Sequence, residues 1–229
     1  LRQSISERNL HWRYNTSVGA GLPINFALAD LQNSGDKITR IEGVFSGTLS
    51  WLCSKYDGSV AFSDLVLEAQ KMGFTEPDPR EDLSGRDMQR KLLILARELG
   101  IELDLDDISL QALMPDELAQ GSWGDFLANK DKLNAFIKHH ADAANAQAAV
   151  LRYTGLLALE QGKVSAKVGI TYAPKGDALA NLTPGDNIFV INSQWYNENA
   201  LVIQGPGAGK EVTAAGVHSD LYWLVKNLK

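Results

Sequence analysis

The chain has 229 residues, of which 45% are apolar and 22% charged, a composition typical of a folded globular protein rather than a disordered or collagen-like chain. Its 22 basic and 28 acidic residues give a formal net charge of −6, so we expect neither nucleic acid nor an anionic membrane surface as a partner. The apolar runs fall far short of the roughly 20 residues that span a bilayer. The length allows one large domain or two small ones.

Two further features of the sequence bear on its context. A single cysteine, Cys53, cannot form an internal disulfide, which favours a reducing compartment and predicts a cytoplasmic location. The sequence begins with Leu1 rather than methionine, and we therefore expect it to be part of a longer chain.

The first hundred residues predict mostly helices. A turn of small residues at 19–23 leads into helical spacing over 24–31, and another helix is expected from about residue 48. The β-branched residues of 37–45 predict one strand between these helices. Helices are also predicted over 62–73, with Ser63 as the N-cap, and over 84–99. For the latter we expect Ser84 to be the N-cap, with Asp87 completing a variant of the capping box.

The remainder of the chain predicts further helices and then strands. Residues 106–146 predict further helices, over DDISLQALM (106–114), over DELAQ (116–120) and from Trp123 onward. By contrast, 149–174 contain two β-rich runs separated by Glu-Gln-Gly-Lys, which is typical of a hairpin. Two more strands are expected over 186–204, followed by a terminal helix whose predicted apolar face consists of Val217, Leu221, Leu224 and Leu228. This order predicts an α+β fold, with helices packed on one face of a mainly antiparallel or mixed sheet.

The densest set of charged side chains lies in GFTEPDPREDLSGRDMQRK, residues 73–91. Asp87 and Lys91 are four residues apart on the predicted helix, the spacing that favours an ion pair, and Lys91 lies at the margin of the apolar stripe. A lysine fixed beside a carboxylate is suited to proton transfer. Glu76, in a loop stiffened by two prolines, could bind a substrate ammonium. The spacing of these residues alone is also compatible with a solvent-exposed start of a helix that has one weak ion pair.

Two glycine-rich turns, SVGAGLP at 17–23 and GPGAGKE at 205–211, are partly similar to phosphate-binding motifs. Neither has the spacing of the dinucleotide fingerprint or of a P-loop. The second turn follows a predicted strand and precedes a helix, so its backbone N–H groups could face an anion. A turn that only permits tight packing is the alternative.

Four segments together resemble homoserine dehydrogenase, and they follow one another in that family's order. They are NTSVGAGLPI (15–24), RIEGVFSGTLSWL (40–52), GFTEPDPREDLSGRDMQRK (73–91) and GAGKEVTAAGVHSDL (207–221). The resemblance implies NAD- or NADP-dependent interconversion of L-homoserine and L-aspartate 4-semialdehyde, in threonine and methionine biosynthesis. GAGLPI and the end of the chain soon after VTAAGVHSDL are most similar to the dehydrogenase half of a bifunctional aspartokinase–homoserine dehydrogenase.

The resemblance also implies roles for individual residues. It assigns Lys91 as the catalytic lysine, Glu76, Asp87, Asp82 and Thr48 to substrate binding, and Gly73 and Gly207 to close approach of the cofactor. A lysine amine, or a water bound to it, can accept the hydroxyl proton of homoserine and return it in reduction. The family can also hold a monovalent cation such as sodium through carbonyls matching Val18, Ala20 and Leu22. Asn15 stands where the family has a carboxylate, so we expect looser cation binding.

The family's N-terminal Rossmann domain, with its glycine fingerprint and a second functional lysine, has no counterpart in residues 1–229. We therefore expect residues 1–204 to form the substrate-binding and dimerisation domain of a homodimer or higher homo-oligomer. Residues 205–229 are expected to be a turn and a helix that belong to the nucleotide-binding domain. One alternative is a non-enzymatic fragment that is inactive without the Rossmann domain. Another is a different semialdehyde enzyme with Cys53 as its nucleophile.

Overall fold

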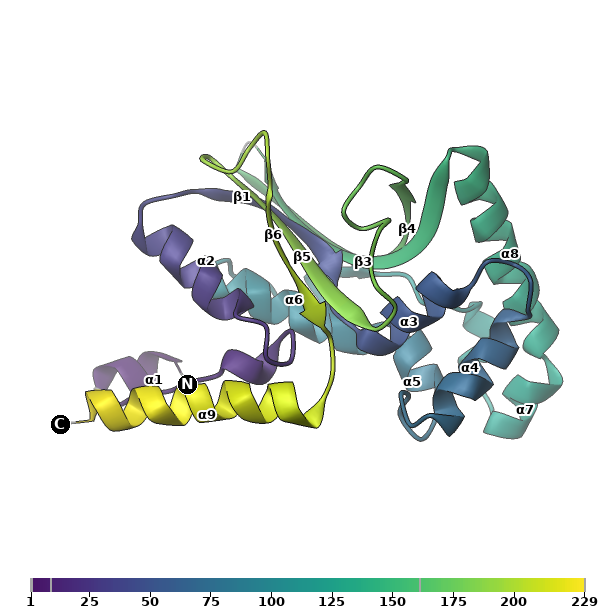
Figure 1. Cartoon of the computed structure of the whole chain (residues 1–229), viewed down its shortest axis with the longest axis horizontal. Helices are drawn as coiled ribbons and strands as arrows, with labels where there is room; N and C mark the ends of the chain where they lie inside the picture. Colours follow the sequence, from purple (N-terminus) through teal and green to yellow (C-terminus); the bar gives the residue numbers. More distant parts are fainter. Residues whose placement is uncertain (1, 9, 161, 229) are drawn as a thin grey trace.

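The computed structural model describes residues 2–8, 10–160 and 162–228 and contains one six-stranded sheet with the strand order β2-β4-β3-β1-β5-β6 (Figure 1). The strands are β1 (Ile38–Val44), β2 (Ser109–Leu110), β3 (Ala149–Glu160), β4 (Lys163–Pro174), β5 (Asp186–Ser193) and β6 (Leu201–Pro206). Neighbouring strands run antiparallel except for β2 and β4, which are parallel. The predicted hairpin is the β3–β4 pair.

Helices account for most of the remaining chain. They are α1 (Arg2–Glu7), α2 (Ile24–Asn33), α3 (Gly47–Lys55), α4 (Phe62–Lys71), α5 (Arg80–Leu83), α6 (Arg86–Glu98), α7 (Trp123–Ala128), α8 (Lys130–Ala146) and α9 (Lys210–Asn227). Short 3₁₀ turns occur at η1 (Asn15–Ser17), η2 (Leu105–Asp107) and η3 (Asp116–Leu118). The predicted α+β class is confirmed.

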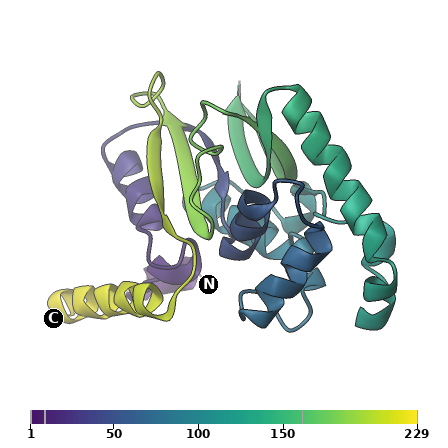
Figure 2. The same cartoon turned by 45° about the vertical axis from the view of Figure 1, so that its right-hand side comes forward.

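The main core lies between one face of the sheet and the helices. Alternate residues of β3, such as Tyr153 and Leu157, point into this core, where they join buried side chains of α2, α3, α4, α6 and α8. On the other face, Leu179 and Leu182 of the β4–β5 loop pack on Val44. Figure 2 shows α8 and α9 at opposite ends of the molecule.

The start of α6 differs from the prediction. Ser84 is the C-cap of α5, and Gly85 rather than Ser84 is the N-cap of α6. The Ser84 hydroxyl donates to the carbonyl of Glu81 at 2.6 Å and accepts from the N–H of Arg86 at 3.3 Å. Gly85 precedes α6 with φ 73° and ψ 0°, a left-handed conformation that favours glycine. A Cβ at Gly85 would overlap the hydroxyl of buried Tyr153. The predicted capping box is therefore wrong, because a tight turn between two helices occupies its place.

The predicted helix over 106–114 is also wrong. After the short turn η2, the chain extends as β2 along the edge of β4, and the N–H of Gln111 donates to the carbonyl of Val168 at 2.9 Å. This pairing satisfies backbone groups that the edge of β4 would otherwise expose. Ile108 and Leu113, on either side, are buried. The neighbouring DELAQ segment contains only the short turn η3.

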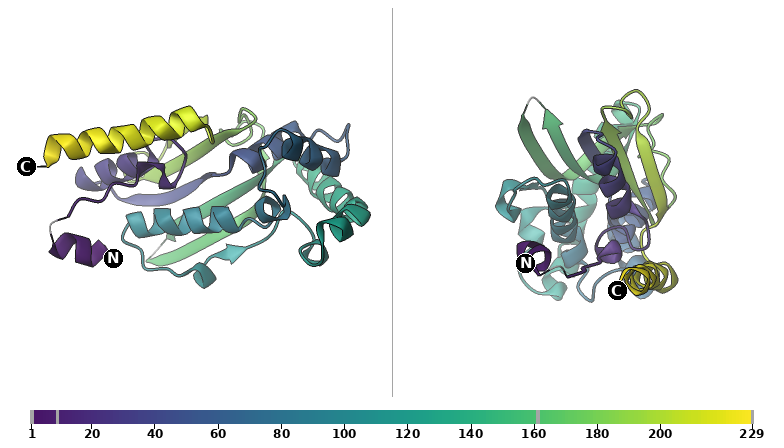
Figure 3. Two further views of the ribbon diagram at one scale, coloured as in Figure 1. Left: turned by 90° about the horizontal axis from the view of Figure 1, so that it is seen from below. Right: turned by 90° about the vertical axis from the view of Figure 1, so that its left-hand side faces the viewer.

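α9 packs on the chain through its small and polar side rather than through its predicted apolar face. Gly216 lies against Thr16, and Asp220 accepts hydrogen bonds from the backbone of Asn15 at 2.8 Å and from Arg13 Nε at 3.3 Å. By contrast, Val217, Leu221 and Leu228 are exposed. Figure 3 shows α9 along one edge of the molecule. Across the described residues, no helix combines the length and apolar character needed to cross a membrane.

Candidate functional site

Lys91 is fixed by two contacts near the start of α6. Its Nζ lies 2.7 Å from Asp87 Oδ2 and donates to the carbonyl of Phe45 at 2.9 Å. The Lys91 side chain is 23% exposed, whereas that of Asp87 is 53% exposed. Met88 and Leu92, on the adjoining face of α6, are fully buried. The predicted ion pair and the predicted position of Lys91 at the margin of the apolar stripe are both confirmed.

A cavity of about 210 Å³ lies beside this lysine and carries several acidic side chains. Its lining residues are Ser46, Leu49, Glu76, Glu81, Asp82, Gly85, Asp87, Met88 and Arg90. Three of the four residues expected to bind substrate thus line one cavity. Lys91 and Thr48 do not line the cavity, but both lie next to it. Lys91 is paired with the lining residue Asp87, and Thr48 lies in α3 between the lining residues Ser46 and Leu49.

At this cavity, the loop that contains Glu76, which we call the acidic loop, is hydrogen-bonded to α5. The backbone N–H of Glu76 donates to Asp82 Oδ2 at 2.9 Å. Burial raises the pKa of the Asp82 carboxyl, and the neighbouring negative charge of Glu76 acts in the same direction, while hydrogen bonds including the one from the Glu76 backbone oppose both. The hydroxyl of Thr48 donates to the carbonyl of Phe74 at 2.5 Å, which joins α3 to the same loop.

Hydrogen bonds outside the cavity also hold the loop that contains Pro77 and Pro79. Arg80 Nε donates to Asp78 Oδ1 at 3.0 Å, and hydrogen bonding from this guanidinium holds the pKa of Asp78 below its usual range. Arg80 Nη1 also donates to the carbonyl of Gly121 at 2.9 Å, and Gln70 Nε2 donates to that of Pro77 at 3.1 Å. The predicted rigid presentation of Glu76 is consistent with these bonds.

This arrangement favours a small substrate that carries an ammonium and a reacting oxygen. Partly exposed carboxylates of Glu76, Asp82 and Asp87 can neutralise an ammonium, and Lys91 Nζ lies where it can exchange a proton with a hydroxyl. In the described part of the chain, no three His, Cys, Asp or Glu side chains are arranged to hold a metal ion.

Glycines bring a second segment against the start of α3. We call residues 185–187 and 205–208, together with Gly47, the glycine cradle. A Cβ at Gly47 would lie 3.2 Å from the carbonyl oxygen of Gly185 and 3.7 Å from Ala208 Cβ. The N–H of Gly207 donates to the carbonyl of Gly185 at 3.1 Å, and a Cβ at Gly207 would overlap the Asn187 carboxamide. The cradle therefore exposes backbone next to the cavity, which suits the close approach of a flat ring.

Gly73 occupies a different kind of position. It follows α4 with φ 72°, and a Cβ built on it would meet no atom within 4 Å. The next residue, Phe74, is the acceptor for the Thr48 hydroxyl, so both glycines expected to approach the cofactor lie in segments that contact α3.

The loop expected to hold a cation contains Val18, Ala20 and Leu22. Ala20 has φ 54°, so its backbone is left-handed, and Val18 is fully buried. Asn15 is 4% exposed, and its Oδ1 has no hydrogen-bond partner among the described residues. An unpaired buried amide oxygen is suited to act as an uncharged ligand of a cation. A Cβ at Gly21 would overlap the backbone of Val212, so α9 packs directly on this loop.

Cys53 lies away from the cavity. It is 4% exposed, and burial raises the pKa of its thiol to about 12, whereas the charge of Arg152 acts in the opposite direction. A thiol with this pKa stays protonated near neutral pH and is a poor nucleophile. These properties oppose the alternative in which Cys53 is a catalytic nucleophile.

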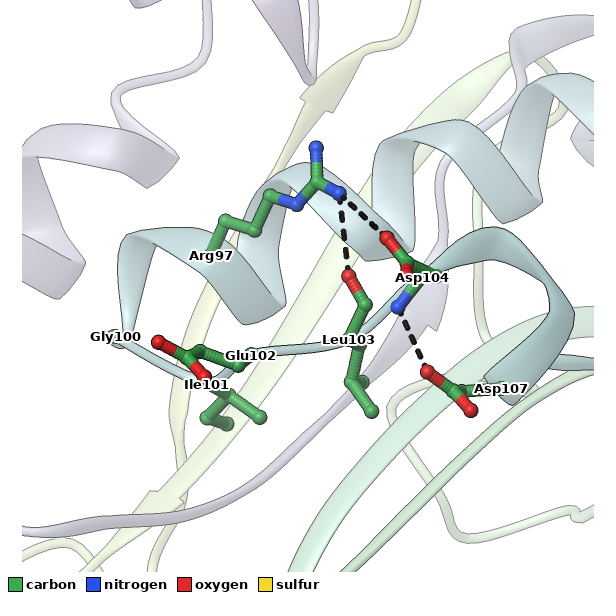
Figure 4. Close-up of a pocket in the computed structure, with 7 residues that line it drawn as sticks. All are labelled: Arg97, Gly100, Ile101, Glu102, Leu103, Asp104 and Asp107. Carbon is green, nitrogen blue, oxygen red and sulfur yellow. Dashed lines mark hydrogen bonds and ion pairs between the residues drawn. The ribbon is translucent and has the colours of Figure 1, made fainter. Parts of the chain in front are cut away.

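A larger hollow, of about 480 Å³, lies at the C-terminal end of α6. Arg97 Nη2 contacts the carbonyl of Leu103 at 3.2 Å and Asp104 Oδ1 at 3.3 Å (Figure 4). Its lining contains none of the residues singled out in the sequence.

Three polar residues that the sequence did not assign to the site also line the smaller cavity: Ser46, Glu81 and Arg90. Ser46 accepts a hydrogen bond from the N–H of Leu49 at 3.3 Å and is the N-cap of α3. Glu81 and Arg90 belong to the charged segment, but spacing along that segment could not show which of its side chains face the cavity.

The fold and the site together define an α+β domain in which a carboxylate-lined cavity, a fixed lysine and a glycine cradle meet at the start of one helix. The family model described as homoserine dehydrogenase matches residues 23–222, and the chain belongs to the homoserine dehydrogenase family. Members of this family are nicotinamide-nucleotide-dependent oxidoreductases.

Known relatives include bifunctional proteins. The chain is 46% identical over 228 residues to bifunctional aspartokinase/homoserine dehydrogenase 2 of Escherichia coli (strain K12), covering 100% of this chain and 28% of the relative. It is 38% identical to homoserine dehydrogenase of Emericella nidulans, covering 94% of this chain and 61% of the relative. The chain thus spans about a quarter of the first relative. A homoserine dehydrogenase structure from Thiobacillus denitrificans has the same fold, with a TM-score of 0.78 and 22% identity over 96% of this chain and 46% of that one.

Proposed function

We propose that this chain is the substrate-binding portion of a homoserine dehydrogenase, which interconverts L-homoserine and L-aspartate 4-semialdehyde with NAD or NADP in threonine and methionine biosynthesis. The observation that carries the proposal is Lys91, held by Asp87 and by the Phe45 carbonyl beside a cavity lined with carboxylates. The whole protein would join this portion to a nucleotide-binding domain, as in a bifunctional aspartokinase–homoserine dehydrogenase.

In this proposal Lys91 exchanges the proton of the substrate oxygen. The lysine amine, or a water that it binds, accepts the hydroxyl proton of homoserine during oxidation and returns it during reduction. Glu76 and Asp87 bind the substrate ammonium, and Asp82 supports them from α5. Thr48 contributes a hydroxyl at the start of α3. The nicotinamide ring, when bound, supplies the site that accepts or donates hydride.

The remaining assignments follow the same proposal. Residues 1–204 form the substrate-binding and dimerisation domain of a homodimer or higher homo-oligomer in the cytoplasm. Residues 205–229 belong with the nucleotide-binding domain, which would cover the exposed side chains of Val217 and Leu221 on α9. Gly73 and Gly207 border the cofactor. A sodium ion would bind the carbonyls of the Val18–Leu22 loop, with the unpaired Oδ1 of Asn15 as a further ligand.

The test uses the full-length protein that contains this chain. We expect homoserine-dependent reduction of NADP or NAD, followed through the absorbance of the reduced cofactor. A full-length protein that binds cofactor but oxidises no homoserine would contradict the proposal. Calorimetry of the 229-residue chain alone is expected to show no cofactor binding. Micromolar binding of NADP to it would overturn the expectation that a separate nucleotide-binding domain is needed.

A further inference from the structure

Asn187, on β5, has a wholly buried side chain whose polar atoms make no hydrogen bonds with the residues that the structure describes. It is 0% exposed, and among the described residues neither its Nδ2 nor its Oδ1 has a partner. At Asn15 and Asn25, the other two amides in which a buried atom lacks a partner among the described residues, that atom is Oδ1 alone. Leaving a buried polar group unpaired destabilises the folded state, so an amide with both groups unpaired needs an explanation.

The Asn187 carboxamide lies against the glycine cradle. Asn187 pairs with Gly205 across β5 and β6, and two residues later the chain reaches Gly207. A Cβ on Gly207 would overlap Asn187 Oδ1 and lie 2.6 Å from its Cγ. One side of Gly207 Cα is therefore filled by the carboxamide. The 205–208 turn also lies beside Gly47, because a Cβ on Gly47 would be 3.6 Å from the carbonyl carbon of Gly207.

We propose that Asn187 is a positioning residue for the nicotinamide cofactor. Its carboxamide supports Gly207 from the sheet side and holds the turn 205–208 beside the start of α3, so that the opposite side of Gly207 borders the cofactor. In the cofactor-bound enzyme the two unpaired groups of Asn187 form hydrogen bonds with peptide groups of this turn. The inference rests on the proposed function, in which Gly207 approaches the cofactor.

A purely structural role for Asn187 makes a different prediction. Leucine has the same branching at Cγ as asparagine but no polar atoms, so Asn187→Leu removes two unpaired buried groups while keeping the shape of the side chain. If Asn187 only fills space, this substitution leaves cofactor binding unchanged. If Asn187 positions the turn, it weakens cofactor binding without lowering stability.

The experiment compares Asn187→Leu with Asn192→Leu in the full-length enzyme. Asn192 lies on the same strand, is partly buried, and pairs with Arg40 away from the cradle. The measurements are the melting temperature without cofactor, the Kd for NADPH by fluorescence titration, and KM for homoserine. We expect Asn187→Leu to melt no lower than the parent and to bind NADPH at least about tenfold more weakly, with KM for homoserine within about twofold. Asn192→Leu is expected to leave the Kd unchanged.

A Kd for NADPH within about twofold of the parent in a folded Asn187→Leu enzyme would overturn the inference. If that variant does not fold, Asn187→Ala replaces it, because it removes the support of Gly207 without adding volume. A parent that binds NADPH but does not oxidise homoserine counts against the proposed function, and the Asn187 comparison can still be made. A parent that oxidises homoserine while the Asn187 variants bind NADPH normally counts against this inference alone.

Discussion

The carboxylate-lined cavity and the glycine cradle border the same end of α3 but are built in opposite ways. Beside the cavity, charged side chains are paired, as Lys91 is with Asp87 at 2.7 Å. In the cradle, four of the positions are glycines, and the buried carboxamide of Asn187 has no hydrogen-bond partner among the described residues. The difference indicates that one region is suited to recognise charge on a small substrate. The other is suited to bring backbone close to a flat ring, and its polar groups are left for a bound partner.

Removing the lysine is expected to have the largest effect. Lys91→Ala eliminates the amine proposed to exchange the substrate proton, and general acid–base groups typically contribute about 10²–10⁴-fold to turnover. We expect kcat of the full-length enzyme to fall within that range while NADPH still binds. Lys71→Ala, at an exposed position in the last turn of α4, is the control and is expected to leave kcat unchanged. Turnover of Lys91→Ala within about twofold of the parent would contradict the role.

Adding a side chain in the cradle is expected to weaken cofactor binding. In Gly207→Ala the new methyl would overlap the Asn187 carboxamide and lie 3.0 Å from the Gly185 carbonyl oxygen. We expect a loss of about 1–3 kcal/mol in the free energy of unfolding and about tenfold weaker NADPH binding. Calorimetry of the full-length enzyme measures its affinity for NADPH.

Gly176→Ala is the matched control for this substitution, because a Cβ there meets nothing within 4 Å and its backbone is not left-handed. An equal loss of NADPH affinity in both alanine variants would show that the cradle has no special role.

Neutralising the acidic loop is expected to affect the substrate alone. Glu76→Gln keeps the shape of the side chain but removes the charge proposed to bind the ammonium, so KM for homoserine should rise about tenfold. The Kd for NADPH should stay within about twofold of the parent. Glu102→Gln, in the larger hollow at the end of α6, is the control. A rise in the NADPH Kd without a rise in KM would mean that the two regions do not divide recognition in this way.

Local sequence patterns predicted much of the fold and part of the site. The helix predicted over 62–73, the β3–β4 hairpin and the Asp87–Lys91 pair depend on residues near one another in the chain, and all three are present. The helix spans 62–71, and Ala61 rather than the predicted Ser63 is its N-cap. Spacing also placed Lys91 at the edge of a buried stripe, because helical periodicity fixes which side chains share a face.

The errors occurred where distant contacts decide the outcome. β2 forms because its residues pair with β4, about sixty positions further along, so the helical character of 106–114 is overridden. The inward face of α9 is set by Asp220, which binds the backbone of Asn15 near the other end of the chain. The unpaired state of Asn187 could not be predicted either, since a buried amide without partners has no sequence signal.

The smallest expected effect tests the electrostatics of the cavity through pH. Because burial raises the pKa of Asp82, the folded chain binds this proton more tightly than the unfolded chain does. The resulting stabilisation is fully present below the unfolded pKa of about 3.8 and is lost as the pH rises through the folded pKa. Asp82→Asn cannot ionise but retains an oxygen for the Glu76 N–H. Its free energy of unfolding, relative to the parent, should therefore be higher near pH 7 than near pH 4.

Asp78→Asn is expected to show the opposite trend, because hydrogen bonding from Arg80 lowers the pKa of Asp78. The contribution of Asp78 to stability is present above its unfolded pKa and is lost as the pH falls through the lower folded value, so the parent's advantage over Asp78→Asn shrinks on acidification. Urea unfolding of this chain at several pH values measures both differences. Parallel pH profiles for the two variants would mean that the cavity does not impose the burial that distinguishes Asp82 from the arginine-paired Asp78.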